Sequence, residues 1–411
     1  MASKIKSGSV LGGILLVAGS CIGAGMLALP VVTGLGGFVP SIVMFLFTWL
    51  FMTTTGLLLL EANLALGYDL SLISLVEKTL GPIGKGLCWL LFIFLFYSLN
   101  IAYIAASGGV LQAIAADAFD LELPYWFGSA LFTALFGIVL YIGTKPVDYL
   151  NRLLMFGLII VYFVLVLLGS TYVQRELLAH HHWSYSFAAI PLMIISFGFH
   201  NMIPSLAMYL KGDLKRLRII IIVGSSIPLV VYLLWQAVML GMIPLDELLQ
   251  AFQQGVAATE ALRSIVGKSW INSVAQAFTL FAITTSFLAQ SLSLVDFLAD
   301  GLKIPKVKQG RLALVMLTLI PPFALAFIYP GIFIRMLNLA GGFSAVILFG
   351  LMPAMMVWVL RYRMKKKMPP IMPTGRVLLT IVLIVAIGIF ALEAAQELGL
   401  SLLPRETEII P

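Results

Sequence analysis

The chain has 411 residues, of which 61% are hydrophobic and only 10% are charged, and its mean hydropathy is +1.07. Soluble domains are about half apolar and a quarter charged, so this composition excludes a soluble globular protein and indicates a polytopic membrane protein. The net charge of +7 does not indicate nucleic-acid binding, because the basic residues fall between long apolar runs.

Apolar runs long enough to cross a bilayer recur along the whole chain. A transmembrane helix needs roughly 20 apolar residues, and lipid offers backbone groups no partners outside a helix or a closed barrel. The runs are too long and continuous for the short alternating strands of a barrel. We therefore predict an all-α polytopic membrane protein with eleven spans, at about 9–36, 39–65, 85–116, 125–144, 149–171, 187–210, 218–242, 270–298, 312–329, 336–360 and 375–397.

The first span contains a weak point, the stretch "GSCIGAG" at residues 19–25. Glycine costs about 1 kcal/mol relative to alanine in a helix, so three glycines in seven positions predict an interruption. Bare backbone groups at membrane depth are tolerated only where they line a polar cavity. A half-helix N-terminus suits a carboxylate and exposed carbonyls suit an ammonium group, so the stretch is a candidate site for an amino acid zwitterion. Close helix packing through the G-x-x-x-G spacing of Gly19 and Gly23 is the structural alternative.

Span six contains a second weak point, because Gly198, Asn201 and Pro204 fall within seven positions. Spans one and six open two successive sets of five, and broken helices at matching positions of two halves indicate a transporter built from inverted repeats. We predict a first repeat over 1–171, a second over 187–360, a peripheral eleventh span at 375–397 and an external tail at 398–411.

The basic residues predict the orientation. With the N-terminus in the cytoplasm, 20 of the 25 Lys and Arg residues fall in cytoplasmic segments, as the positive-inside rule requires. We therefore expect a cytoplasmic N-terminus and a C-terminus outside. The basic cluster at 361–367 is expected to contact anionic lipid at the cytoplasmic face.

The two interrupted stretches carry a family resemblance. "GSCIGAGMLALP" (19–30) and "SFGFHNMIPSL" (196–206) resemble the two signature stretches of the hydroxy and aromatic amino acid permeases. The span count agrees, and so do "LLLLEANL" (57–64), "NRLL" (151–154), "GSSIPLVVYLLWQ" (224–236) and "SFLAQSLSLVDFLAD" (286–300). The chain looks most similar to the tyrosine-specific members, and the tryptophan members are similar too. The family belongs to the amino acid–polyamine–cation superfamily.

The resemblance implies a five-plus-five inverted-repeat fold of the leucine-transporter type with helices one and six broken. It also implies ion-driven uptake by alternating access across the bacterial inner membrane. The implied cargo is an aromatic L-amino acid, tyrosine first, with tryptophan or phenylalanine as alternatives. A glycine is usual in the family where this chain has Asn201, which bears on selectivity. The residues expected to bind the substrate are Gly19, Ser20, Cys21, Gly23, Ala24, Gly25, Tyr97, Asn100, Phe197, Gly198, Phe199, His200 and Asn201. Tyr103 in span three is expected to face the same cavity.

Ionisable residues inside spans are functional candidates, and this chain has few. The resemblance implies proton symport, and His200 is a candidate proton-coupling residue because its ordinary pKa permits proton exchange near neutrality. Thr284 and Thr285 offer paired hydroxyls of the kind that bind sodium in related folds, so sodium coupling is the alternative; such hydroxyls also bond their own helix. Glu61 and Asp296, near cytoplasmic span ends, are candidate gate residues.

The sequence does not indicate an enzyme. It has no nucleophile–base pair at membrane depth, and Cys21 and Cys88 do not have metal-ligand spacing, so we expect no metal and no cofactor other than the coupling ion. A channel, or a membrane receptor that senses an amino acid, remains the alternative class. The expected partners are the amino acid and the lipid bilayer, and the sequence does not specify an oligomeric state.

Overall fold

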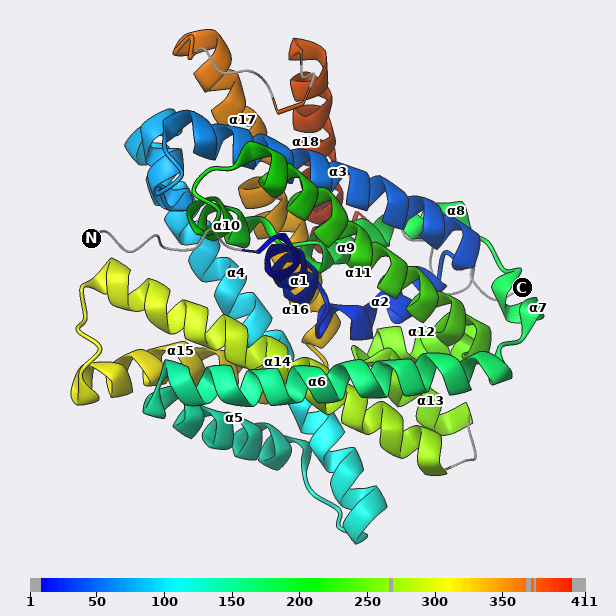
Figure 1. Ribbon diagram of the computed structural model, residues 1–411. Helices are drawn as coiled ribbons and strands as arrows, with labels where there is room; N and C mark the ends of the chain where they lie inside the picture. Colours follow the sequence, from blue (N-terminus) through cyan, green and yellow to red (C-terminus); the bar gives the residue numbers. More distant parts are fainter. Residues whose placement is uncertain (1–8, 266–268, 367–370, 373–374, 401–411) are drawn as a thin grey trace.

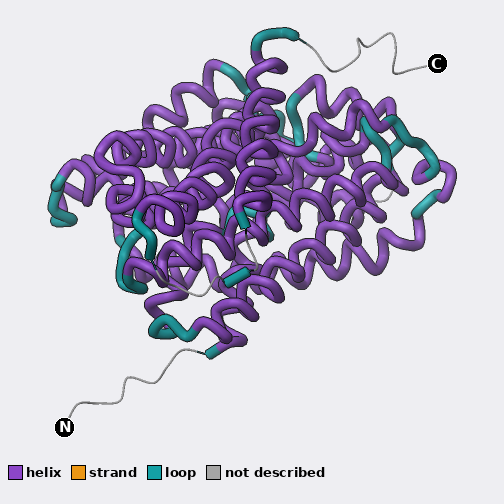
Figure 2. The backbone as a smooth tube through the Cα atoms, turned by 90° about the horizontal axis from the view of Figure 1, so that it is seen from above, coloured by secondary structure: helices purple, strands orange, loops and turns teal. Residues whose placement is uncertain are grey.

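The computed structural model describes residues 9–265, 269–366, 371–372 and 375–400 and consists of helices joined by short loops (Figures 1 and 2). Within these ranges the chain forms no β-strand, and one isolated bridge joins Gly37 to His181. The α-helices are α1 Val10–Cys21, α2 Gly25–Gly34, α3 Phe38–Leu66, α4 Leu72–Phe119, α5 Tyr125–Ile142, α6 Thr144–Gly169, α7 Arg175–Leu178, α8 Trp183–Ser186, α9 Ile190–Ser196, α10 Ile203–Tyr209, α11 Leu214–Met242, α12 Leu245–Gln254, α13 Ala258–Ile265, α14 Ser269–Leu302, α15 Lys308–Ile328, α16 Phe333–Leu339, α17 Met352–Trp358 and α18 Arg376–Glu397.

Five further segments have other helical geometries. Three are short 3-10 helices, η1 Ser170–Tyr172, η2 Phe187–Ala189 and η3 His200–Met202. Two are π-helical, η4 Ala340–Leu351 and η5 Val359–Arg363, and they lie on either side of α17. A π-helix pairs residue i with i+5, and long π-helical runs are rare.

The expectation of an all-α membrane protein is confirmed. Ten helical segments of the described chain are long and apolar enough to span a membrane, and the bent pair α1 and α2 makes an eleventh. One boundary differs from the sequence prediction, because α4 begins at Leu72 rather than near residue 85. The chain kinks at Gly81, whose φ is +78°, just before Pro82, and a short amphipathic segment precedes the span proper.

The first predicted break is present between α1 and α2. α1 ends at Cys21, Ile22 is extended with a ψ of 109°, and α2 restarts at Gly25 at an angle of 54°. The backbone N–H of Ala24 donates to Ser286 Oγ of α14 at 2.9 Å instead of to its own helix. The glycines therefore allow a break that a neighbouring helix stabilises.

The second break separates α9 from η3 and α10. α9 ends at Ser196, Phe197 to Phe199 are not helical, and η3 begins at His200. Pro204 stands in the first turn of α10, where its missing N–H would have no helical partner.

Two side chains of α11 bond to backbone at the breaks, Tyr232 to both and Trp235 to the first. The Tyr232 hydroxyl lies 2.6 Å from the Cys21 carbonyl oxygen and 2.8 Å from that of Ser196, so it bridges the two helix ends. The Trp235 indole N–H donates to the Met26 carbonyl at 2.9 Å. Both side chains are fully buried. In Figure 1, α1 lies near the centre of the molecule, between α3 and α11 on one side and α14 and α6 on the other.

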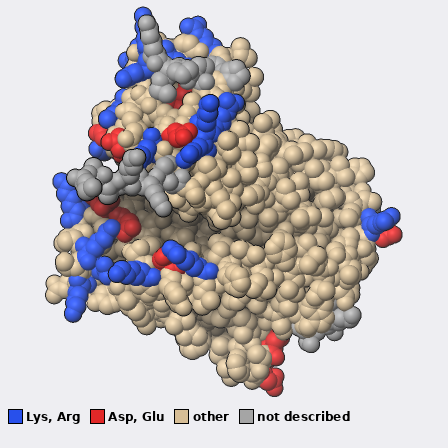
Figure 3. Space-filling model, viewed as in Figure 1, with Lys and Arg blue, Asp and Glu red and all other residues tan. Residues whose placement is uncertain are grey.

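The two faces of the molecule differ in charge. We call the face that holds the start of α1 the N-terminal face, and the face that holds α12 and α13 the opposite face. Lys and Arg gather on the N-terminal face, where the surface is hollowed beside them (Figure 3). Ion pairs on this face join Lys85 to Glu77, Arg152 to Asp148, Arg216 to Asp213, and Lys306 to Asp296.

Candidate functional site

A cavity of about 130 Å³ lies between the two broken helices. The first break supplies an unbroken run of its wall, residues 19–25, and the second break supplies Ser196, Gly198, Asn201 and Met202. α4, α6, α14 and the α16–η4 segment complete the wall. The helix interruptions are therefore the walls of a hollow, as the sequence predicted from their glycines.

The small residues of the first break allow close approach of two serines. A Cβ at Gly23 would overlap Ser286 Oγ of α14, and a Cβ at Gly25 would lie 2.9 Å from Ser196 Oγ of the second break. Larger side chains at Gly23 and Gly25 would push α14 and α9, respectively, away from the first break. Gly23 and Gly25 therefore determine how closely the walls of the cavity meet.

Of the predicted substrate-binding residues, eight line this cavity, and Thr285 lines it as well. The eight are Gly19, Ser20, Cys21, Gly23, Ala24, Gly25, Gly198 and Asn201. Two amide oxygens in the wall, Asn201 Oδ1 and Asn151 Oδ1, are buried without a hydrogen-bond partner within the described ranges. Buried polar atoms are nearly always paired, so these two oxygens are free to accept a hydrogen bond from a bound molecule or water.

The aromatic residues of the second break turn away from the cavity. Phe197 packs against Tyr232 and Phe45, with ring centroids 5.3 and 6.5 Å apart. Phe199 lies over Gly56 of α3 and stacks on His200. These rings fill the core between α3, α11 and the break, and none of them is in the cavity wall.

His200 is also outside the cavity wall. Its Nε2 lies 2.9 Å from Thr55 Oγ1 of α3, and its ring stacks on Phe349 of η4 with centroids 5.0 Å apart. Thr55 Oγ1 also lies 3.1 Å from two carbonyl oxygens of its own helix, and donation of its proton there leaves the Thr55 oxygen to accept from Nε2–H. The His200 ring is thus fixed between Thr55 of α3 and Phe349 of η4.

Tyr97 and Asn100 of α4 face neighbouring helices rather than the cavity. The Tyr97 hydroxyl donates to the Leu317 carbonyl of α15 at 2.9 Å. Asn100 is fully buried, donates to the Phe96 carbonyl and accepts from Ser291 Oγ of α14 at 2.6 Å. Both residues join α4 to its neighbours.

The cavity wall contains aromatic residues that sequence reasoning missed. Phe92 and Phe96 of α4 and Phe349 of η4 line it, together with Tyr103, which the sequence did predict. The spacing of Phe92, Phe96 and Tyr103 places them on one face of α4 and is the signal that could have identified them. Sequence reasoning also missed Asn151, Met155, Gln290 and Ser293.

The cavity extends toward the N-terminal face. The wall residues on the side of the N-terminal face are Asn151, seven residues into α6, and Ser293, late in α14. On the opposite side α2 packs beneath α12 and α13. The hollow therefore reaches from the helix breaks toward one face of the molecule and is covered on the other.

The two candidate gate residues are both paired. Glu61 of α3 is buried and accepts two hydrogen bonds of 2.7 Å from Arg361 of η5 and one of 3.2 Å from the Ile371 N–H. Asp296 of α14 is half exposed and pairs with Lys306 at 2.8 Å. Glu61 thus joins α3 to the end of η5 on the N-terminal face, and Asp296 joins α14 to the loop before α15.

Three ionisable side chains other than Cys and Tyr are buried within the described ranges: Glu61, His200 and Glu393. Glu393 of α18 was not predicted as a site residue. It is 1% exposed, its Oε2 has no hydrogen-bond partner among the described residues, and its side chain lies against Gly342 of η4. An acidic residue inside an apolar span is the sequence signal that marks it.

The candidate ion-coupling hydroxyls lie close together on α14. Thr285 Oγ1 donates within its own helix, to the carbonyl of Phe281 or Ala282. Thr284 Oγ1 is buried and has no partner among the described residues. No group of three His, Cys, Asp or Glu residues suited to a metal ion occurs in the part of the chain that the structure describes.

Comparison with known proteins identifies the family. A model of the tryptophan/tyrosine permease family matches residues 6–393. The chain belongs to this family. The family resemblance inferred from residues 19–30 and 196–206 is thereby confirmed, and the family is one of transport proteins rather than enzymes.

Individual members of the family align over most of their length. The tyrosine-specific transport system 1 of Haemophilus influenzae is 34% identical over 398 residues, 95% of this chain and 97% of the relative. The tryptophan-specific transport protein of the same organism is 32% identical over 369 residues, 85% of this chain and 87% of the relative. The low affinity tryptophan permease of Escherichia coli K12 is 30% identical over 381 residues, 89% of each chain.

Proposed function

We propose that this permease is a secondary active transporter that imports an aromatic L-amino acid, tyrosine first, across the bacterial inner membrane by alternating access. The observation that carries the proposal is the cavity between two broken helices, walled by backbone on one side and by Phe92, Phe96 and Phe349 on the other. Interrupted helices offer a zwitterion both bare N–H groups and bare carbonyls. The aromatic wall suits a ring.

The cavity also favours a ring that carries a hydrogen-bond donor. Asn201 Oδ1 and Asn151 Oδ1 are unpaired acceptors in the wall. A tyrosine hydroxyl or a tryptophan indole N–H can donate to them, whereas a phenylalanine ring cannot. A site built to pair a donor rejects the analogue that lacks it by large factors. Tyrosine and tryptophan are therefore proposed ahead of phenylalanine.

We infer a cytoplasmic N-terminal face, because most Lys and Arg residues gather there. The extension of the cavity toward that face supports an inward-facing state of the proposed cycle. Release of cargo into the cytoplasm requires such a state. Uptake then requires a second state in which α12 and α13 no longer cover α2.

Proton symport is the coupling we propose. The buried ionisable side chains within the described ranges, Glu61, His200 and Glu393, lie outside the cavity wall, so the coupled proton binds apart from the cargo. Sodium coupling is the second candidate, because Thr285 and Ser286 hydroxyls line the cavity beside Ala24 and oxygen ligands suit a hard cation.

The test is uptake of radiolabelled tyrosine into proteoliposomes that contain the purified protein. We expect saturable accumulation with an inward proton gradient, inhibition by unlabelled tyrosine and tryptophan, and weaker inhibition by phenylalanine. Accumulation driven by a sodium gradient alone would show that sodium, rather than a proton, is the coupling ion. Binding without counterflow would identify a receptor, and uptake that does not saturate would identify a channel; either result would overturn the transporter proposal.

A further inference from the structure

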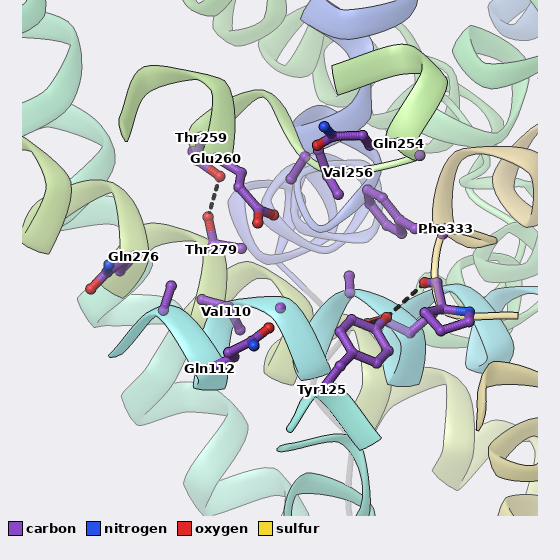
Figure 4. Close-up of a pocket in the computed structure, with 18 of the residues that line it drawn as sticks. Val110, Gln112, Tyr125, Gln254, Val256, Thr259, Glu260, Gln276, Thr279 and Phe333 are labelled. Carbon is purple, nitrogen blue, oxygen red and sulfur yellow. Dashed lines mark hydrogen bonds between the residues drawn. The ribbon is translucent and has the colours of Figure 1, made fainter. Parts of the chain in front are cut away.

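A second cavity, of about 230 Å³, opens at the opposite face of the molecule (Figure 4). Its walls come from α4, the start of α5, α14, the α12–α13 hairpin, the loop between α15 and α16, and the start of α16. Gln254 and Glu260 at its rim are exposed, so solvent reaches it. None of its lining residues belongs to the cavity between the helix breaks.

The two cavities follow one another along the same three helices. We call the cavity between the helix breaks the inner cavity and the second cavity the outer cavity. On α4 the inner cavity is lined between Phe92 and Tyr103, and the outer cavity begins at Ala105. On α14 the outer cavity ends at Thr279, and the inner one begins at Thr285. α16 contributes Phe333 to the outer cavity and Leu337 to the inner one. A molecule that leaves the outer cavity inward therefore meets the inner cavity next.

A thin apolar layer separates the two cavities. Ile104 of α4, Ala282 and Ile283 of α14 and Ile334 of α16 lie between the two sets of lining residues, and each is at most 4% exposed. The Tyr125 hydroxyl bonds the carbonyls of both Ala105 and Pro330, which ties α4 to the α15–α16 loop beside the outer cavity. The outer cavity is thus closed inward and open outward in this state.

The chemistry of the outer cavity matches an aromatic zwitterion. Ala106, Val110, Val256 and Phe333 form an apolar wall for a ring. Figure 4 shows the Glu260 side chain reaching from α13 into the space above α4.

Two oxygen groups suit the cargo's ammonium. The Glu260 carboxylate oxygens lie 3.4 and 3.8 Å from the position of a Cβ at Gly109, directly over the α4 backbone. Asn272 Oδ1 is buried in the wall without a partner in the described chain. A carboxylate and a bare amide oxygen are both acceptors for an ammonium group, and the cargo carboxylate can then stay toward solvent.

We propose that the outer cavity is a second binding site for the same aromatic amino acid, occupied from outside before the apolar layer opens. The ring lies against Val256 and Phe333, and the ammonium group lies between Glu260 and Asn272. This inference rests on the proposed transport function and adds to it a site from which the inner cavity is filled. Concave, largely apolar sites with a few convergent polar groups are typical of small-molecule binding.

The first test is the stoichiometry of equilibrium binding of labelled tyrosine to the purified full-length chain. The wild type should bind two molecules per chain. Gly109→Leu, which fills the outer cavity, and Glu260→Gln, which removes its charge, should each bind one. Gly86→Leu is the matched control, because a Cβ at Gly86 meets nothing within 4 Å on the same helix, and it should bind two. Gly23→Leu, which closes the inner cavity, should bind one.

The second test locates the outer molecule directly. In a Gly23→Leu background, Ala106→Cys should react with a membrane-impermeant maleimide, and tyrosine should slow that reaction whereas glycine should not. The native Cys21 and Cys88 are buried, so the new thiol dominates the labelling. An unchanged labelling rate with tyrosine would overturn the second site. The second site would also be overturned if the wild type bound one tyrosine per chain and Gly23→Leu bound none. That result would leave the proposed function intact. A wild type that binds no aromatic amino acid would instead refute the proposed function.

Discussion

Replacing Tyr232 by phenylalanine tests whether the two helix breaks act as one site. The Tyr232 hydroxyl lies 2.6 Å from the Cys21 carbonyl oxygen and 2.8 Å from that of Ser196, and the ring is fully buried. Tyr232→Phe keeps the ring and removes only the oxygen. Both helix ends then lose the one group that connects them through α11.

The expected magnitude follows from the buried carbonyls. A buried polar group that loses its hydrogen-bond partner costs about 1–3 kcal/mol. The loss lowers the fraction of molecules in which both breaks hold the binding geometry, and the apparent Kd rises by the same factor. We therefore expect the Kd for tyrosine to rise about 5- to 150-fold in Tyr232→Phe. Equilibrium binding to purified protein measures it.

Tyr162→Phe is the matched control. The Tyr162 hydroxyl donates to the Val231 carbonyl of α11 at 2.9 Å and is nearly buried, but it contacts neither break. Both substitutions should lower the temperature of thermal unfolding, and only Tyr232→Phe should weaken binding. If both variants bind like the wild type, or if both weaken binding equally, the idea that Tyr232 unites the two breaks is refuted.

Three further predictions concern other parts of the molecule. Gly23→Leu should abolish tyrosine uptake while the amount of protein in the membrane stays normal, because the leucine side chain would overlap Ser286. Normal uptake by this variant would contradict the assignment of the cavity as the substrate site. Glu61→Gln should lower the free energy of unfolding by about 1.5–3 kcal/mol, because it removes the charge-assisted pair of hydrogen bonds between Glu61 and Arg361, as thermal unfolding would show; replacing both partners with neutral residues should restore part of it. Burial lowers the pKa of His180 below its ordinary 6.5, so folding favours the neutral ring and the docking of this loop should weaken as the pH falls through 6.5. Protease cleavage near residue 180 should then rise at acid pH in the wild type but not in His180→Asn.

The first break shows what a sequence can predict about this site. All seven residues of 19–25 line the cavity: residues 19–21 end α1, residues 22–24 are non-helical, and Gly25 begins α2, so the stretch turns its backbone to the hollow. Glycine content is a local property, and its effect on helix geometry does not depend on distant parts of the chain. The break and its place in the wall could therefore be predicted without coordinates.

The second break shows where prediction stops. Gly198 and Asn201 line the cavity, while Phe197, Phe199 and His200 pack against α3, α11 and η4. The sequence identifies the interruption but not the rotation of the chain within it. That rotation depends on which distant helix offers room for each ring.

α4 illustrates a misjudged helix face. Tyr97, Asn100 and Tyr103 were predicted to share one cavity, yet successive residues of a helix differ by about 100°, so Tyr97 and Tyr103 cannot point the same way. The face that includes Tyr103 also includes Phe92 and Phe96, and these are the residues in the wall. Periodicity alone would have corrected this prediction. The pairing of Glu61 with Arg361 joins residues 300 positions apart, and no local pattern predicts it.

The π-helical geometry of η4 places spare chain length beside the inner cavity. Phe349 of this segment lines the inner cavity and stacks on His200. Gly342 of the same segment lies against the Glu393 side chain of α18. Tightening any turn from i→i+5 to i→i+4 pairing would slide these two positions against each other without breaking the helix. A shift of Phe349 at the inner cavity would therefore be felt at the contact between Gly342 and Glu393, seven residues away on the same segment.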